Sequence, residues 1–227
     1  MLLQSHTTDQ SQRSHEEFNL LYTYHMKTVQ KYKMCRRLGP GVFEKCQTPK
    51  FVMSEARHAK SMKNKRPKAL SGYALQFVEK QKVRFMYGIS EKQFQNYINE
   101  AVAHKGTPAT EHLFELLETR LDNVIYRLGL AHTRRLSRQM ASHGHVTVNG
   151  KKTTVASQRI KIGDVIAVRA GSAKSPLFAE MAKKLKEYTI PNWLTFDAEK
   201  LSGSMQGKPK NIEGYLDLNT VLEFYSR

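Results

Sequence analysis

The sequence predicts an α+β fold that is mostly helical and contains one short, mainly antiparallel sheet. Apolar residues recur at helical spacing from residue 71 to about residue 143. The spacing then changes to the alternation typical of strands between residues 146 and 168, around two turn signals. A helical pattern returns at 177–188, and a last apolar stretch runs from residue 218 to residue 225. Helices are therefore expected before and after a small sheet, without internal repeats.

The composition favours a nucleic-acid partner. The 227 residues include 37 Lys+Arg and 20 Asp+Glu, a formal net charge of +17. So large an excess repels itself in a compact state unless a polyanion neutralises it. No apolar run approaches the ~20 residues that a membrane-spanning helix needs, so we expect no membrane partner. The two cysteines, Cys35 and Cys46, could form one disulfide but are no disulfide scaffold, and a reducing cytosol is the default compartment.

The positive charge is concentrated in two separate stretches. Residues 50–92 hold 11 basic and 3 acidic side chains, and residues 131–174 hold 9 and 1, a net charge of +8 in each. Two basic surfaces on a near-neutral scaffold suit a protein that grips a folded polyanion at two places. Two lysine-rich, solvated faces are the alternative, because charge counts alone discriminate poorly.

Two segments are expected to lack regular structure. Residues 1–25 are rich in Ser, Gln, Thr and His, and we interpret them as a disordered extension upstream of Met26. Residues 57–68 are basic and interrupted by Pro67, which predicts a loop or arm able to lie along phosphates.

Two helices with clear start signals follow. Ser71 can cap a helix that runs to about residue 87 and stops at Gly88. Ser90 and Gln93 form a capping box for the next helix, which is expected to end at Gly106. Ile89 and Phe94 are placed for its hydrophobic staple. The core side of the first helix comprises Leu75, Val78, Val83 and Met86, whereas the cations off that stripe are Lys80, Lys82 and Arg84.

A third helix is expected from Thr107-Pro108 to Gly129, and a shorter fourth helix from Thr133 to about residue 143. The third helix has the apolar set Leu113, Leu116, Leu117, Leu121, Val124, Ile125 and Leu128. The fourth helix has Leu136 and Met140 on its core side.

The sheet is predicted from alternation around two tight turns, Asn149-Gly150 and Gly163-Asp164. Its inward-facing residues are expected to be Val146, Val148, Val155, Ile160, Ile162, Ile166 and Val168.

The fourth helix carries an unusual charge pattern at its start. Arg134, Arg135 and Arg138 lie in its first turns, where the helix dipole disfavours positive charge. A bound phosphate would reverse that conflict. Gln139 lies on the same side. We expect the double substitution Arg134→Ala with Arg138→Ala to weaken RNA binding with little loss of stability, although a solvated arginine face is the alternative.

Four stretches of the chain resemble a known family. Residues 120–153, RLDNVIYRLGLAHTRRLSRQMASHGHVTVNGKKT, resemble the RNA-binding domain named after small-subunit ribosomal protein number four. Residues 72–101, GYALQFVEKQKVRFMYGISEKQFQNYINEA, resemble the helical body of that ribosomal protein, as do NWLTFDAEKLSG (192–203) and the ending VLEFYSR. The resemblance covers roughly residues 26–227.

The resemblance implies an architecture and an interface. A helical body of residues 26–106 and 176–227 would pack around an inserted RNA-binding module at 107–175. The module would consist of two helices packed on the short sheet. The rRNA-contacting candidates carried over by position are Arg66, Lys68, Tyr73, Lys80, Lys82, Arg84, Arg134, Arg135, Arg138, Gln139, Lys151 and Lys152.

The resemblance also implies a role and partners. The family binds small-subunit rRNA directly, at a multi-helix junction in the rRNA 5′ domain, and nucleates subunit assembly. It neighbours ribosomal protein number five, near where mRNA enters, and influences decoding accuracy. A cytoplasmic or organellar ribosome would be its location. No catalytic residue, cofactor or resident metal is expected.

The N-terminal segment departs from the family pattern. Many members bind zinc there through four cysteines, but this chain retains only Cys35 and Cys46. Phe51 stands where a further cysteine is expected. His58 could be a third ligand, yet no fourth is evident, whereas a structural zinc site needs four. We interpret residues 26–60 as a degenerate zinc-site segment.

Two rival functions remain to be weighed. Pseudouridine synthases and tyrosyl-tRNA synthetases share the module, and Arg120-Leu121-Asp122 resembles the synthases' catalytic-aspartate motif. Asn-Val-Ile-Tyr follows, however, without the Thr/Ser-Gly turn of such a site, so Asp122 is expected to be an exposed or salt-bridged helix residue. The other rival is a heat-shock or assembly factor that recycles ribosomal particles. Such factors are typically shorter and lack the helical body at 71–105, and cosedimentation with salt-washed small subunits would separate the ideas.

Overall fold

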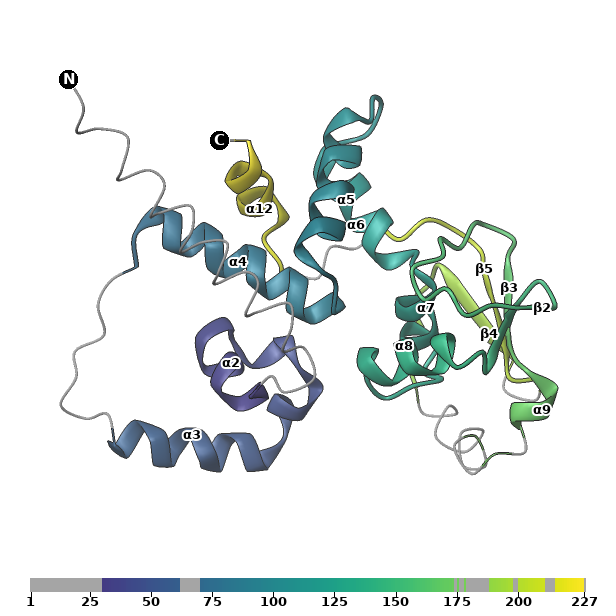
Figure 1. Ribbon diagram of the computed structural model, residues 1–227, viewed down its shortest axis with the longest axis horizontal. Helices are drawn as coiled ribbons and strands as arrows, with labels where there is room; N and C mark the ends of the chain where they lie inside the picture. Colours follow the sequence, from purple (N-terminus) through teal and green to yellow (C-terminus); the bar gives the residue numbers. More distant parts are fainter. Residues whose placement is uncertain are drawn as a thin grey trace, which may run out of the picture. The chain divides into compact units, whose positions relative to one another are not determined.

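The structure is a computed structural model that describes residues 30–61, 70–173, 175, 178, 188–197, 200–210 and 215–226. The chain divides into two compact units, Met1–Arg66 (unit 1) and Pro67–Arg227 (unit 2), both drawn in Figure 1. The extension expected at 1–25, the candidates Arg66 and Lys68, and most of the helix expected at 177–188 lie outside the described residues.

Unit 1 is built from short helices around a small core. Its elements are α2 (Lys31–Leu38), the 3-10 turns η1 (Pro40–Val42) and η2 (Glu44–Gln47), and α3 (Pro49–Ser61). Cys35, Cys46 and Phe51 form the buried core, with Tyr32 and Phe43 packed against it. Residues 57–61, expected in a loop, are the last part of α3, so the loop prediction is wrong there.

Three of the helices described in unit 2 begin at predicted capping residues, whereas the helix predicted from a Thr107 cap begins at Ala109, with Pro108 at the N-cap and no side-chain cap. The described helices are α4 (Gly72–Tyr87), α5 (Glu91–Ala103), α6 (Ala109–Glu118), α7 (Leu121–Arg127), α8 (Arg134–Ser142), α9 (Ala170–Ala173) and α12 (Leu218–Tyr225). The hydroxyls of Ser71, Ser90 and Thr133 each accept a hydrogen bond from a backbone N–H three residues on. Gly88 ends α4 in the left-handed conformation, φ 62°. These start and stop signals are confirmed.

The single helix expected at 107–129 is in fact two helices. The chain bends between α6 and α7 at Thr119 and Arg120, and the backbone there pairs with a distant loop. Arg120 forms an isolated antiparallel bridge with Arg159, and the Ile160 N–H donates to the Thr119 carbonyl. The predicted apolar residues are buried nonetheless, those of α6 in one hydrophobic cluster and those of α7 and Leu128 in another.

Five antiparallel strands form one sheet in the order β2-β1-β3-β5-β4. Their bounds are β1 (Val146–Val148), β2 (Lys151–Lys152), β3 (Val165–Val168), β4 (Leu194–Asp197) and β5 (Ser202–Met205). Asn149 and Gly150 turn β1 into β2 with φ values of 50° and 78°, as their sequence predicts. Val155 and Ile162 are exposed, contrary to expectation, because they lie in the connection between β2 and β3 rather than in a strand.

Two hydrophobic clusters organise unit 2. The body cluster joins residues of α4, α5, α6 and α12, and the module cluster joins residues of α7, α8 and the sheet (Figure 1). The two clusters therefore do not divide the chain at the predicted module boundaries, 107 and 175. Helix α6 belongs to the body cluster, whereas β4 and β5 extend the module sheet because β5 pairs with β3. The predicted α+β class is confirmed.

Candidate nucleic-acid interface

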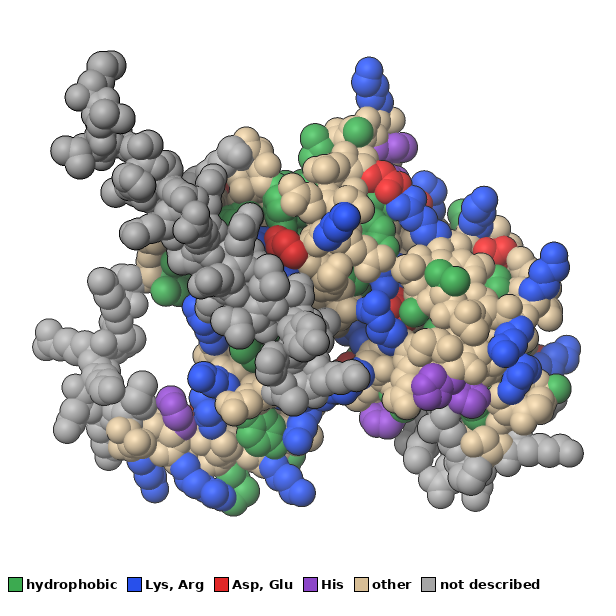
Figure 2. Space-filling view, in the orientation of Figure 1, with side chains coloured by type: hydrophobic (Ala, Val, Ile, Leu, Met, Phe, Trp, Pro, Cys, Tyr) green, Lys and Arg blue, Asp and Glu red, His purple; other side chains and the backbone are tan. Residues whose placement is uncertain are grey.

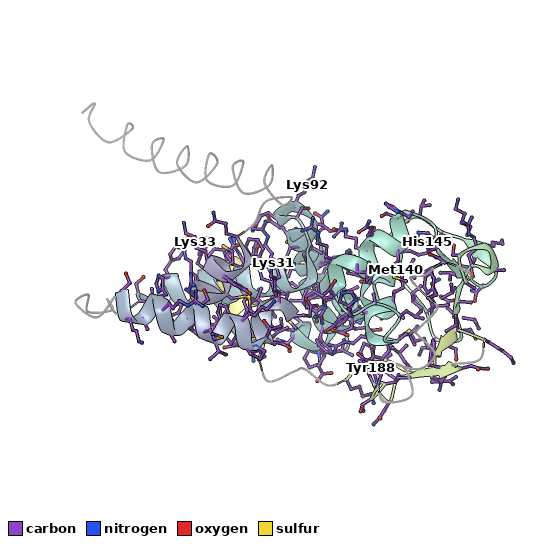
Figure 3. All side chains as sticks on the ribbon, turned by 90° about the horizontal axis from the view of Figure 1, so that it is seen from below. Lys31, Lys33, Lys92, Met140, His145 and Tyr188 are labelled. Carbon is purple, nitrogen blue, oxygen red and sulfur yellow. A yellow bond between two sulfur atoms is a disulfide. The ribbon has the colours of Figure 1, made fainter. Side chains whose placement is uncertain are left out.

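Helix α8 has one face in the core and one that carries the predicted cations. Ser137, Met140 and Ala141 are buried, whereas Arg135 and Gln139 are exposed. Figure 3 labels Met140 within the module. The three arginines of α8 therefore differ in their surroundings. Arg135 is exposed, whereas Arg134 and Arg138 have partners within unit 2.

Arg134 is held in place by an aromatic and amide environment. Its Nε donates to Asn123 Oδ1 at 2.9 Å. The guanidinium lies 4.4 Å from the ring centroid of Tyr126 and 5.1 Å from that of Tyr87. Such stacking fixes a planar guanidinium and favours its charge. The contacts offset part of the conflict with the helix dipole inside the protein.

Arg138 joins helix α8 to the end of helix α4. One Nη donates to the backbone carbonyl of Gly88, and the same nitrogen lies 3.9 Å from Asp122 Oδ2. The side chain stays 43% exposed. Removing Arg134 and Arg138 together would therefore also remove contacts within the fold, so the expectation of little stability loss no longer holds.

The β1–β2 hairpin places two lysines beside the end of α8. Lys151 and Lys152 are both exposed. A Cβ built on Gly144, just after α8, would lie 2.3 Å from Lys152 Cε, so the lysine side chain crosses this glycine closely. Gly144 also has a φ of 69°, where glycine is favoured. The structure thus brings Lys152 beside the C-terminal end of α8, whereas the sequence analysis combined the hairpin with the arginines at the helix start.

The module has other exposed cations that the sequence analysis did not name as candidates. Lys161 and Arg169 are exposed on the loops that flank β3. Only the high net charge of residues 131–174 indicated them. Figure 2 shows blue Lys and Arg side chains over the region where Figure 1 places β2. The basic surface of the module is therefore broader than the α8–hairpin pair.

The cations of α4 are placed differently from the prediction. Lys80 and Arg84 are only 5% and 4% exposed, and both pair with Glu91. The Lys80 Nζ also lies 4.7 Å from the ring centroid of Phe224. Burial lowers the pKa of Lys80, while its hydrogen bond to Glu91 acts in the opposite direction. Lys80 and Arg84 are thus buried in the fold and not exposed for contact with rRNA, because helix α12 packs on α4.

The other two α4 candidates are more accessible. Lys82 is half-buried, pairs with Glu79 and lies 4.8 Å from the Tyr215 ring centroid. Tyr73 is 45% exposed, with its ring 5.5 Å from that of Phe224. Tyr73 therefore keeps the accessible aromatic surface that base stacking requires, whereas the charge of Lys82 is already compensated.

A buried carboxylate connects the body cluster with the module. Glu118, at the end of α6, accepts hydrogen bonds from Arg127 at 2.8 and 2.9 Å and from the Tyr87 hydroxyl at 2.6 Å. Asn123 Nδ2 donates to it at 2.8 Å. Burial by itself raises the pKa of Glu118, but the Arg127 hydrogen bonds and nearby positive charges hold that pKa below its ordinary value. Glu118 therefore stays ionised and fixes α4, α6 and α7 together.

A buried arginine makes a second connection. Arg120 is fully buried; its Nε and Nη2 donate to Asp122 at 3.1 and 2.8 Å, and its Nη1 donates to the Tyr97 hydroxyl at 2.7 Å. Asp122 is thus a salt-bridged residue of the first turn of α7. Its carboxylate is engaged in the fold and only 4% exposed, which leaves it poorly placed for catalysis.

The segment around the two cysteines does not fit zinc. Cys35 and Cys46 form a disulfide with each other, and Phe51 is buried against them. His58 is exposed on α3. The described residues contain no group of three or more His, Cys, Asp or Glu side chains placed to hold a metal ion. Four zinc ligands are therefore not supplied by this part of the chain.

A membrane-spanning helix is likewise not found: within the described ranges, none has both the length and the apolar character that crossing requires.

Comparison with known proteins places the chain in a family. Residues 26–118 match the family model for the ribosomal protein S4/S9 N-terminal domain, and residues 119–166 match the S4 domain. The two matches meet at the bend between α6 and α7. Together with the basic surface around α8, they define an RNA-binding ribosomal protein.

The relatives give the same assignment. The chain is 41% identical over 200 residues to small ribosomal subunit protein uS4 of Acetivibrio thermocellus, covering 86% of this chain and 96% of that protein. It is 46% identical over 162 residues to the uS4 protein of Listeria monocytogenes serovar 1/2a, covering 70% and 80%. The chain belongs to the uS4 family of small ribosomal subunit proteins, a structural and non-enzymatic family.

Proposed function

We propose that this protein is a structural constituent of the small ribosomal subunit and binds rRNA through the exposed cations of its module. The observation that carries the proposal is the exposure of three module cations, Arg135 at the start of α8 and Lys151 and Lys152 on the β1–β2 hairpin. All three are exposed, and none forms an ion pair within the described part of the chain. Exposed cations without a carboxylate partner are free to neutralise phosphates, which supplies much of the affinity for RNA.

The predicted rRNA-contacting residues differ in how accessible they are to RNA. Gln139 and Tyr73 are exposed and suit hydrogen bonding and stacking, respectively. Arg134 and Arg138 are positioned by the fold, and Arg138 keeps a partly exposed side chain. Arg66 and Lys68 stay predictions. Lys80, Lys82 and Arg84 are assigned instead to ion pairs within unit 2, so we expect them to support the interface indirectly.

The finer role is proposed from the resemblance to the family, with one supporting feature of the fold. The protein binds a multi-helix junction of the rRNA 5′ domain and nucleates assembly of the subunit in a cytoplasmic ribosome. It neighbours ribosomal protein number five near where mRNA enters, and this contact supports decoding accuracy. The supporting feature of this chain is its two-cluster unit 2, whose buried polar links give rRNA a preformed surface.

The test measures how binding depends on salt. The variant Lys151→Ala with Lys152→Ala and the wild-type protein are titrated with a 5′-domain rRNA fragment at several salt concentrations. Each lost phosphate contact reduces the slope of log affinity against log salt by ~0.7–0.9, so the double variant should be less steep by about 1–2. Its affinity should also be lower at every salt concentration.

A control pair removes two lysines whose charges are already compensated. Lys200 pairs with Asp197 and Lys208 pairs with Glu115, at 3.7 and 3.0 Å. Lys200→Ala with Lys208→Ala should leave the slope close to that of the wild type. Equal slopes for the two double variants would refute the assignment of the hairpin to rRNA.

Cosedimentation separates a ribosomal constituent from a recycling factor built on the same module. We expect the protein to remain with small subunits washed at high salt, as a structural constituent does. Quantitative release by the wash would favour the factor.

A further inference from the structure

The described part of unit 1, residues 30–61, buries only a small hydrophobic core. This part contains one hydrophobic cluster, formed by Cys35, Cys46 and Phe51 with Tyr32 and Phe43 at its edge. Units of this size rarely bury enough apolar surface to fold without a disulfide or a structural metal. A cross-link within residues 30–61 would therefore contribute strongly to holding α2, the 3-10 turns and α3 together.

The disulfide lies where such a cross-link is most effective. Cys35 is in α2 and Cys46 in η2, and each is 2% exposed. Phe51 of α3 is equally buried and belongs to the same hydrophobic cluster as the two cysteines. The centroid of its ring lies 5.4 Å from that of Tyr32. Figure 3 shows the yellow sulfur–sulfur bond next to helix α2, on which Lys31 and Lys33 are labelled. One covalent bond thus joins α2 to η2, and Phe51 packs α3 against the same cluster.

Lysine side chains lie over the aromatic rings at the edge of this core. Lys31 Nζ lies 5.7 Å from the Phe43 ring centroid, and Lys45 Nζ lies 5.5 Å from that of Tyr32. Residues 30–61 hold 8 basic and 2 acidic side chains, a net charge of +6. Mutual repulsion among these cations opposes the compact state, which increases the need for the cross-link.

We propose that the Cys35–Cys46 disulfide takes the place of a metal as the staple of unit 1, so that the order of this unit follows the thiol–disulfide balance of its surroundings. Phe51 completes the core as an apolar residue and supplies no metal ligand. Unit 2 has its own two hydrophobic clusters and does not depend on the bond. The proposal does not rest on the rRNA-binding function.

The chemistry requires only a small-molecule thiol such as glutathione. Two thiols reduce the bond: the Cys35–Cys46 sulfur–sulfur bond breaks, each cysteine sulfur gains a proton, and the reductant is oxidised to its own disulfide. In a cytosol that keeps thiols reduced, disulfides are typically transient or sensing ones. Oxidation of the surroundings would then order unit 1, and reduction would loosen it.

The test compares hydrogen exchange in the full-length protein after equilibration with oxidised glutathione and after full reduction. Alkylation with a mass readout counts the free thiols in each sample. We expect no free thiol after oxidation and two after reduction. Amide exchange in residues 31–61 should become at least about tenfold faster on reduction, whereas exchange in α6 and α7 should not change.

Two further samples distinguish a disulfide staple from a metal site. The variant Cys35→Ser with Cys46→Ser should exchange like the reduced protein under both conditions. A chelator should leave the oxidised protein unchanged, and added zinc should not restore protection to the reduced protein. The proposal is overturned by two free thiols after oxidation, by exchange in unit 1 that ignores reduction, or by protection that depends on zinc.

Discussion

Glu118 illustrates how one buried carboxylate determines the placement of several other side chains. It is 1% exposed and bonded to Arg127, Asn123 and Tyr87. Removing one partner of a buried ion pair leaves the other charge uncompensated, which costs far more than losing a surface pair. The residue also keeps Arg127 engaged within the fold, so that this arginine does not add to the exposed basic surface.

We predict that Glu118→Gln destabilises unit 2 by about 3–5 kcal/mol, because the buried carboxylate and its ion pair with Arg127 are lost. Urea unfolding followed by circular dichroism measures the change. Glu111→Gln is the matched control, since Glu111 lies on the same helix and is exposed, and should change stability by less than about 0.5 kcal/mol. Equal effects of the two substitutions would contradict the role assigned to Glu118.

At the scale of elements, close packing between α7 and the sheet depends on a glycine. A Cβ built on Gly203 in β5 would lie 2.5 Å from Leu128 Cδ2 and 2.8 Å from the Thr195 backbone carbonyl. The carbonyl belongs to the neighbouring strand β4 and cannot move without disturbing the ladder. Gly203 therefore permits Leu128, which follows α7, to sit directly on the sheet.

We predict that Gly203→Ala destabilises the protein by about 1–3 kcal/mol, the usual cost of forcing extra volume into a packed site. Gly207→Ala is the control, because a Cβ there would meet nothing within 4 Å. Thermal unfolding of both variants measures the difference. A Gly203→Ala protein as stable as the control would show that the sheet and α7 adjust freely.

Helix boundaries belong to the same scale. The capping hydroxyls of Ser71, Ser90 and Thr133 act within one turn, so local sequence predicts those helix starts correctly. The bend at Thr119–Arg120 is different, because its backbone pairs with Arg159 and Ile160 some 40 residues later. The apolar residues on both sides of the bend keep helical spacing, so the sequence pattern does not reveal where one helix ends and the next begins.

At the scale of the whole molecule, unit 2 couples two hydrophobic clusters through buried charges. Glu118 bonds Tyr87 of the body and Arg127 of the module, and Arg120 bonds Tyr97 and Asp122. Exposed Arg159 and Glu100 form a further ion pair between the two parts. These links explain how a basic module surface can be presented in a fixed relation to the helical body.

We predict that unit 2 loses stability as the pH falls below about 4. The pKa values of Glu118 and Glu91 lie below those of the unfolded chain, so at acidic pH the unfolded state binds more protons than the folded state. The stabilisation is complete above the unfolded pKa and is lost as the pH falls through the folded pKa. Urea unfolding between pH 7 and pH 3 should show this loss, and Glu118→Gln should reduce it. A pH-independent stability would contradict the assignment.

The sequence by itself determined the α+β class, the capped helices, the Asn149-Gly150 hairpin and the exposed cations Arg135, Lys151 and Lys152, and its motifs indicated the family. These features depend on residues a few positions apart, or on the type of a single side chain, and both can be read from the sequence. Tertiary structure decided the burial of Lys80 and Arg84, because α12 covers α4 and Tyr225 bonds Glu91 across 134 residues. It also decided the partner of Asp122 and the entry of β4 and β5 into the module sheet. Contacts between segments so far apart leave no local periodicity, since packing alone brings their side chains together.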